Sequence, residues 1–242
     1  MNVVAALLVA LTATSIAAPS LEGASLTRRI VQSYTAQARG AATFVVQTRT
    51  AIRAGLFSHS EFSETAYAVV DGAVAGKIVL RSVANGATAN AVQLAKLSAE
   101  PDGPLSRYGM RLPTSEAAAG DYQYGDPRER SEWTDVDFAT TVKDEAHGNG
   151  MLTFDISQKR ITQVVFRPAQ LPPHATSMSV TIDFGRAYEG CWDIVKITRT
   201  FAGRQGLLSG SGTTTSVYER YQGHASAAEA LKAMASIVPS AS

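Results

Sequence analysis

Hydrophobic positions recur along the chain with two different periods, and these periods predict three helices separated by strands. Helical spacing occupies residues 25–40, 86–101 and 226–238. The last segment opens with Ser226-Ala-Ala-Glu229, a capping box in which the serine and glutamate side chains bind each other's free backbone N–H groups. Its predicted buried stripe comprises Leu231, Met234, Ile237 and Val238.

Between the helical segments the hydrophobic period is two, which is typical of half-buried strands. The cleanest alternation runs from Met178 to Phe184, where every second residue is apolar. The dipeptide Asp71-Gly72 favours a tight turn and predicts a hairpin. Short connections imply antiparallel pairing, because parallel neighbours need a crossover of about a dozen residues or more. We expect strands at residues 42–52, 61–70, 77–83, 151–156, 161–166, 178–184, 192–201 and 207–221.

This order of elements predicts an α+β fold, in which a curved antiparallel sheet carries helices against its concave face. Small residues alternate along the last strand, where Gly210 and Gly212 share one face. Glycines that permit a bulge or a bend are the simpler explanation, and space for a ligand is the alternative. The candidate apolar groove combines this face with the cleanest strand and comprises Met178, Val180, Ile182, Phe184, Gly210 and Gly212.

The segment from Pro101 to Arg130 departs from this regular pattern. It contains four prolines and four glycines and exceeds the ~12–15 residues usual for a structureless loop. We interpret it as an irregular lid, a partner-binding segment or a disordered stretch. Disorder is the favoured interpretation for its middle, residues 115–120.

The N-terminus has the pattern of a signal peptide. Residues 1–17 carry no charged side chain, contain an apolar run and end in the small-x-small pattern Ser15-Ile16-Ala17. We expect cleavage before Ala18, with a buried N-terminal helix as the alternative. Residues 18–242 would then form a single domain that is secreted or periplasmic.

Composition and charge exclude several classes of protein. The chain has 242 residues, of which 45% are hydrophobic, and a formal net charge of +1. This balance gives no electrostatic footprint for nucleic acid, and no run after the N-terminus reaches the ~20 apolar residues of a membrane helix. The single cysteine excludes an internal disulfide. We expect a soluble monomer.

The candidate chemistry is sparse. The best constellation is Asp144, Glu145 and His147, together with His174 if folding brings it close, but a solvated turn is the simpler interpretation. Cys191 at a strand start is expected to be a buried, inert thiol. We therefore predict no catalytic residue, no metal site, no cofactor and no enzymatic activity.

Two segments carry a resemblance to a known family. Residues 67–86 hold a strand, the Asp71-Gly72 turn, a second strand and Asn85-Gly86, and residues 150–168 hold a strand, a polar turn and a strand. With the strands that follow, they resemble the periplasmic lipoprotein-carrier superfamily, which includes the outer-membrane lipoprotein-sorting proteins.

The resemblance implies an unclosed β-barrel whose concave face, covered by helices, holds acyl chains. The chain would then be an exported, non-enzymatic protein that shelters a lipid or a lipoprotein acyl chain between sheet and helices. An exported protein-interaction module that uses residues 101–130 is the alternative. A hydrolase that depends on His147 and His174 is a third hypothesis.

Overall fold

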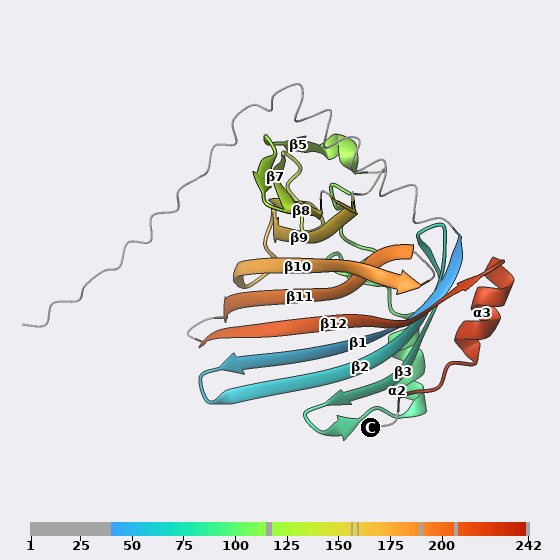
Figure 1. Ribbon diagram of the computed structural model, residues 1–242. Helices are drawn as coiled ribbons and strands as arrows, with labels where there is room; N and C mark the ends of the chain where they lie inside the picture. The colour runs from blue at the N-terminus through green and yellow to red at the C-terminus, as the bar shows by residue number, and fades with distance from the viewer. Residues whose placement is uncertain are drawn as a thin grey trace, which may run out of the picture.

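A computed structural model gives the architecture in Figure 1. The predicted signal peptide and the first predicted helix lie outside the described residues, which are 40–114, 118–155, 157–158, 160–188, 191–205 and 208–240.

The described residues form one twelve-stranded sheet in which every pair of neighbours is antiparallel. The order is β4-β3-β2-β1-β12-β11-β10-β9-β8-β7-β5, with β6 also paired to β7, so the sheet is not closed. The predicted unclosed, antiparallel α+β fold is confirmed. The strands are β1 (Ala41–Ala54), β2 (Phe57–Val70), β3 (Ala73–Ala84), β4 (Ala87–Thr88), β5 (Tyr122–Tyr124), β6 (Arg128–Arg130), β7 (Trp133–Thr140), β8 (Gly148–Asp155), β9 (Arg160–Pro168), β10 (Ala175–Tyr188), β11 (Cys191–Gln205) and β12 (Leu208–His224).

Two hairpins close through tight turns, and the sequence predicts the first of them. Asp71 and Gly72 between β2 and β3 both have positive φ angles, 49° and 81°, as a type I′ turn requires. Asn85 and Gly86 repeat this geometry, with φ angles of 49° and 83°. The second pair therefore closes the β3–β4 hairpin before the helix begins.

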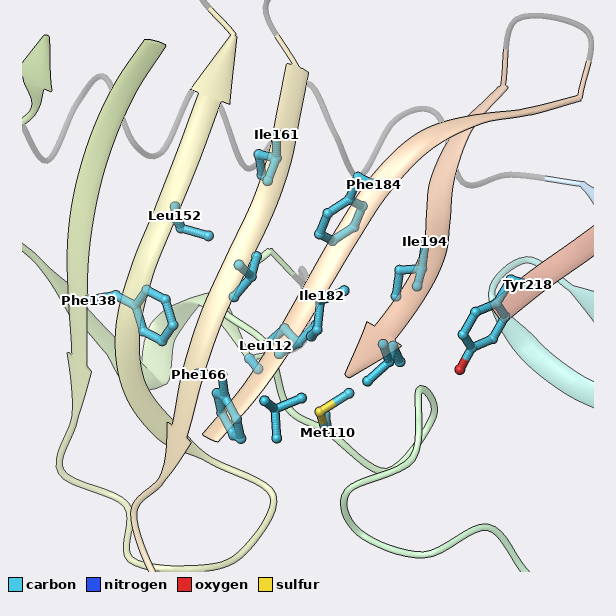
Figure 2. Packing of buried hydrophobic residues seen from close by; sticks show 14 of the residues in the cluster. Met110, Leu112, Phe138, Leu152, Ile161, Phe166, Ile182, Phe184, Ile194 and Tyr218 are labelled. Atoms are coloured by element: carbon cyan, nitrogen blue, oxygen red, sulfur yellow. The ribbon is translucent and has the colours of Figure 1, made fainter. Parts of the chain in front are cut away.

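Both faces of the sheet are buried where β1 runs through it. Phe44 and Val45 are adjacent, so they point to opposite faces, and each has no exposed surface. Phe44 belongs to a large apolar cluster that extends to β7 (Figure 2). Val45 belongs to a smaller cluster on the other face.

A segment without long strands covers the large cluster. We call residues 102–114 and 118–124 the strap. Met110, Leu112, Ala118 and Tyr122 of the strap are buried in the cluster, and Figure 2 shows Met110 and Leu112 among side chains of the sheet. The expectation of disorder is therefore wrong for residues 118–120, while residues 115–117 lie outside the described part. Two strands of three residues each, β5 and β6, lie within residues 101–130.

A buried guanidinium fastens the strap to the sheet. Arg107 donates hydrogen bonds to the Tyr221 hydroxyl (2.7 Å) and to Asp193 Oδ2 (2.6 Å). Its Cζ atom also lies 4.9 Å from the ring centroid of Phe44 and 5.3 Å from that of Tyr218. These distances are within the range of cation–π attraction, which is strongest where water is excluded.

Helix α2 (Ala91–Ala99) covers an edge of the sheet. A capping box between Asn90 and Gln93 starts it. The Ser98 hydroxyl accepts the backbone N–H of Val79 at 2.8 Å, which satisfies a donor on strand β3. The predicted helix is therefore confirmed, and it protects a strand that has only the two residues of β4 on its outer side.

Helix α3 (Ala227–Ala235) packs on the smaller cluster through Ala230 and Met234. Ser226 caps it as predicted, but the Glu229 carboxylate accepts the N–H of Ala225 instead of the N–H of Ser226. The predicted stripe is wrong in part: Leu231 is 39% exposed and Val238 is 70% exposed. The reason is that the helix ends at Ala235, before Val238, and that Ala230 and Met234 are the helix residues buried against the sheet.

The chain after α3 is held by a second buried charge. Glu64 of β2 has no exposed surface and accepts hydrogen bonds from Arg220, from Ser240 N and from the Ser240 hydroxyl. Arg220 also donates to the backbone oxygen of Val238 at 3.1 Å. The C-terminal residues are therefore anchored by charge as well as by apolar contact.

Replacing Arg107 by methionine should lower the free energy of unfolding by about 3 kcal/mol, because Asp193 and the Tyr221 hydroxyl lose their buried donor. Urea denaturation followed by circular dichroism measures this. Arg111→Met is the matched control, since Arg111 is an exposed arginine of the same strap and should change stability by less than about 0.5 kcal/mol. Equal effects of the two variants would contradict the role given to Arg107.

Candidate functional site

A groove opens beside the ends of β10, β11, β12 and β1, and its volume is about 850 Å³. No described residue of the strap or of a helix lines it. Its apolar lining comes from Pro168, Leu171, Met178 and Phe201, and two arginines, Arg53 and Arg167, also line it. The remaining lining residues are alanines, serines, threonines and one glycine.

The strand register explains why this surface is hollow. Arg53, Ser211, Ala202 and Ser177 lie directly opposite one another across β1, β12, β11 and β10. Residues opposite each other in antiparallel strands present their side chains to the same face. The next such row contains Ala51, Thr213, Thr200 and Ser179. Seven of these eight side chains are small, so they leave space that larger residues would fill.

Gly212 lies between these two rows and faces Phe201 on the other side of the sheet. A Cβ atom on Gly212 would stand 2.6 Å from Phe201 Cζ and 2.8 Å from the backbone oxygen of Ala51. Glycine is therefore required for the Phe201 ring to lie across β12. The small-residue strand that the sequence singles out thus accommodates an aromatic side chain of the neighbouring strand.

The candidate groove residues separate into different environments. Met178 and Gly212 line the groove. Val180, Ile182 and Phe184 are buried in the large cluster. Gly210 lies against the β1 backbone, where a Cβ would be 2.8 Å from the oxygen of Arg53.

A second groove of about 450 Å³ continues the first across β1 and β2, and both are lined by Ala51 and Thr213. Phe62 lies in it between two guanidinium groups. The Cζ atoms of Arg49 and Arg81 are 5.2 Å and 5.6 Å from the centroid of its ring. Arg49 and Phe62 face each other directly on β1 and β2.

The two grooves form a basic surface. No acidic residue is among the described residues that line the larger groove, and Glu61 is the acidic residue that lines the smaller one. None of Arg49, Arg53 and Arg167 forms an ion pair within the described ranges. Sequence reasoning missed these residues because the net charge is nearly zero. Arg49 and Arg53 are four residues apart on one strand, and this even spacing is the signal that places them on one face.

The constellation around His147 forms a structural junction. Its Nδ1 atom lies 2.9 Å from Asp144 Oδ1, and its Nε2 atom lies 3.2 Å from Asp121 Oδ2. The adjacent backbone oxygen of Ala146 accepts the N–H of Arg111 in the strap. His174 is exposed at the turn before β10, and no hydrogen bond joins it to His147 in the described part of the chain.

Burial opposes ionisation of Asp144, but hydrogen bonds from the backbone and ring of His147 outweigh it, and the pKa of Asp144 is lowered from 3.8. Cys191 is half-buried at the start of β11, and burial is the main cause that raises the pKa of its thiol from 9.0. A raised thiol pKa agrees with the predicted inert cysteine, because the thiolate is the reactive form.

Within the described ranges, no group of three or more His, Cys, Asp or Glu side chains is arranged to hold a metal ion. None of the helices in the same ranges combines the length and the apolar character needed to cross a membrane.

Comparison with known proteins gives matches among solved structures alone. No protein-family model and no curated protein matches the sequence. A LolA superfamily protein from Nitrosomonas europaea is similar at 11% identity, with a TM-score of 0.41 and coverage of 82% of this chain and 93% of the other.

Two further structures show a comparable similarity. A domain assigned to an outer membrane lipoprotein-sorting protein of Vibrio parahaemolyticus has 11% identity and a TM-score of 0.44, over 83% of this chain and 93% of the other. A DUF1329 family protein from Desulfovibrio piger has 12% identity and a TM-score of 0.43, over 86% and 94%. The similarity of the chain to these three structures is distant, at 11–12% sequence identity.

Replacing Asp144 by asparagine should reduce stability at pH 7 by no more than about 1 kcal/mol, because this carboxylate is largely exposed and screened. A lowered carboxyl pKa stabilises the fold above the unfolded value of 3.8 and loses that effect as the pH falls through the folded value. The difference between wild type and variant should therefore shrink as the pH falls below 3.8. Urea denaturation at pH 7, 5 and 3 tests this, with Glu145→Gln as the neighbouring control. A difference at pH 3 as large as the difference at pH 7 would contradict it.

Proposed function

We propose that the chain is an exported, non-enzymatic binding protein that holds a lipid or a lipoprotein acyl chain in the larger groove. The observation that carries the proposal is an open groove of about 850 Å³ that is lined by Pro168 and Leu171 and by two arginines, neither of which forms an ion pair with another described residue. Ligand sites of about 300–1,000 Å³ commonly combine apolar walls with a few polar groups that fix orientation.

The chemistry of the lining favours an amphiphile with an anionic end. Pro168 and Leu171 offer apolar contact, and Arg53 and Arg167 offer charge-assisted hydrogen bonds to a carboxylate or a phosphate. In the described geometry the interior between strap and sheet is filled by protein side chains. The ligand position that we propose is therefore the groove at the strand ends and differs from the space between sheet and helices that the resemblance implies.

Export is supported by the N-terminal sequence. The uncharged apolar run and the small residues at 15–17 have the pattern of a signal peptide that is removed from the mature protein. The proposal therefore places the mature chain outside the cytoplasm, in the periplasm or beyond.

The two other hypotheses have less support. A protein-interaction module would need an accessible segment at residues 101–130, but Met110, Leu112 and Tyr122 are committed to the core. A hydrolase would need a free imidazole nitrogen beside its nucleophile, but both ring nitrogens of His147 contact carboxylates.

Organic extraction of the purified chain, followed by mass spectrometry, should recover a lipid. Ser211→Trp places an indole on the groove floor and should reduce the recovered lipid at least tenfold. Gln123→Trp is the control, since Gln123 is exposed on β5 at the other edge of the sheet and should leave the lipid content unchanged. A wild-type chain without lipid, or a Ser211→Trp variant with the wild-type amount, would overturn the proposal.

A further inference from the structure

The hairpin between β1 and β2 ends in two apolar side chains that no described residue covers. Leu56 is fully exposed and Phe57 is 72% exposed, next to Gly55, whose φ angle of 59° makes the tight turn. In Figure 1 this hairpin closes at the end of the long strands opposite α3. Large apolar residues side by side at a projecting tip are unusual on a soluble surface and indicate contact with an apolar phase or partner.

Arginines adjoin this tip on one face of the sheet. Arg53 lies three residues before Leu56, and Arg49 lies four residues before Arg53 on the same face of β1. Arg167 lines the same groove as Arg53. All three are exposed, and the ion pairs in the described part of the chain involve none of them.

This combination of apolar tip and basic flank fits the surface of an anionic bilayer. Leucine and phenylalanine partition into the boundary between head groups and acyl chains, while arginine binds lipid phosphate and keeps its charge in water. A protein partner would need a pocket shaped for a projecting tip, whereas a bilayer accepts such a tip without a preformed cavity. The charge complementarity therefore selects a lipid surface as the occupant.

We propose that the chain docks on anionic membranes through this end of the sheet, with Leu56 and Phe57 inserted and Arg49, Arg53 and Arg167 against the phosphates. The groove opens beside the same strand ends, so docking would bring its mouth to the lipid surface. The inference goes beyond the proposed function, because docking depends on the tip whether or not the groove holds a ligand.

Sedimentation with vesicles tests the proposal. The purified chain should bind vesicles of phosphatidylcholine with phosphatidylglycerol at least tenfold more tightly than vesicles of phosphatidylcholine alone. Raising the salt concentration should weaken this binding, because salt screens exposed charges. Equal binding to both vesicles, or to neither, would overturn the proposal.

Three variants separate the contributions of the apolar tip and of the arginines to vesicle binding. Leu56→Ser with Phe57→Ser should weaken binding to the anionic vesicles at least tenfold. Arg49→Gln with Arg53→Gln should weaken it and reduce its salt dependence. Val92→Ser is the control, because Val92 is an apolar residue of α2 that is 79% exposed, and it should bind as wild type does.

All substituted side chains are exposed, so each variant should keep the wild-type melting temperature. Light scattering distinguishes a second copy of the chain as the occupant. A tip variant that becomes monomeric from a dimeric wild type, with unchanged vesicle binding, would overturn the proposal. Unchanged vesicle binding of the tip variant would by itself also overturn the proposal. The lipid content of the groove, measured by extraction, tests the proposed function separately and does not depend on the vesicle result for the tip variant.

Discussion

The buried guanidinium of Arg107 is the contact on which the arrangement of the molecule depends. It lies against aromatic rings of β1 and β12 and pairs with Asp193 of β11, so one strap residue contacts three neighbouring strands. A buried ion pair adds little net stability, since desolvation offsets most of the attraction. It nevertheless fixes the position of the strap, because separating the two charges would leave each of them buried without a partner. Glu64 does the same for the chain after α3 on the other face. Two segments that lack long strands are thus held in place by charge.

The strap, held by Arg107, covers one half of the long strands and leaves the other half uncovered. On one face of β10, Val180 and Ile182 lie in the core, whereas Met178 lines the groove. On the same face of β12, Tyr218 is buried, whereas Gly212 lines the groove. On β12, a large aromatic residue gives way to small residues where the cover ends. The groove therefore results from a change of composition along continuous strands, and their hydrogen-bonded ladders keep its floor rigid.

Local signals in the sequence predicted most of the long strands, helices α2 and α3 and the first hairpin turn, because each depends on neighbours a few residues apart. The Asp71-Gly72 turn and the Ser226 cap are examples. The eight-residue strand β7 and the short strands β4, β5 and β6 were not predicted. The burial of the strap could not be predicted in this way, because Arg107 meets partners 86 and 114 residues away. The position of the groove could not be predicted from local signals either. Alternation assigned Met178, Val180 and Ile182 to one face of the sheet, but the place where the strap ends decides which of these side chains remains uncovered. Arg49 and Arg53 share a face by simple spacing, and only the fold shows that Arg167 joins them.

The division also separates the residues that stabilise the fold from those available for binding. Phe44 and Ile182 are buried in the large cluster, and the Arg107 guanidinium lies over the Phe44 ring, so substitutions there affect packing and burial of charge. Arg53, Ser211 and Leu56 are exposed, and substitutions at such positions usually change stability little. The strand ends can therefore carry an apolar tip and arginines that form no ion pair with the other described residues. A core would not tolerate these features, and the strand ends can carry them because the charged contacts of the strap and of the C-terminal residues already hold the sheet.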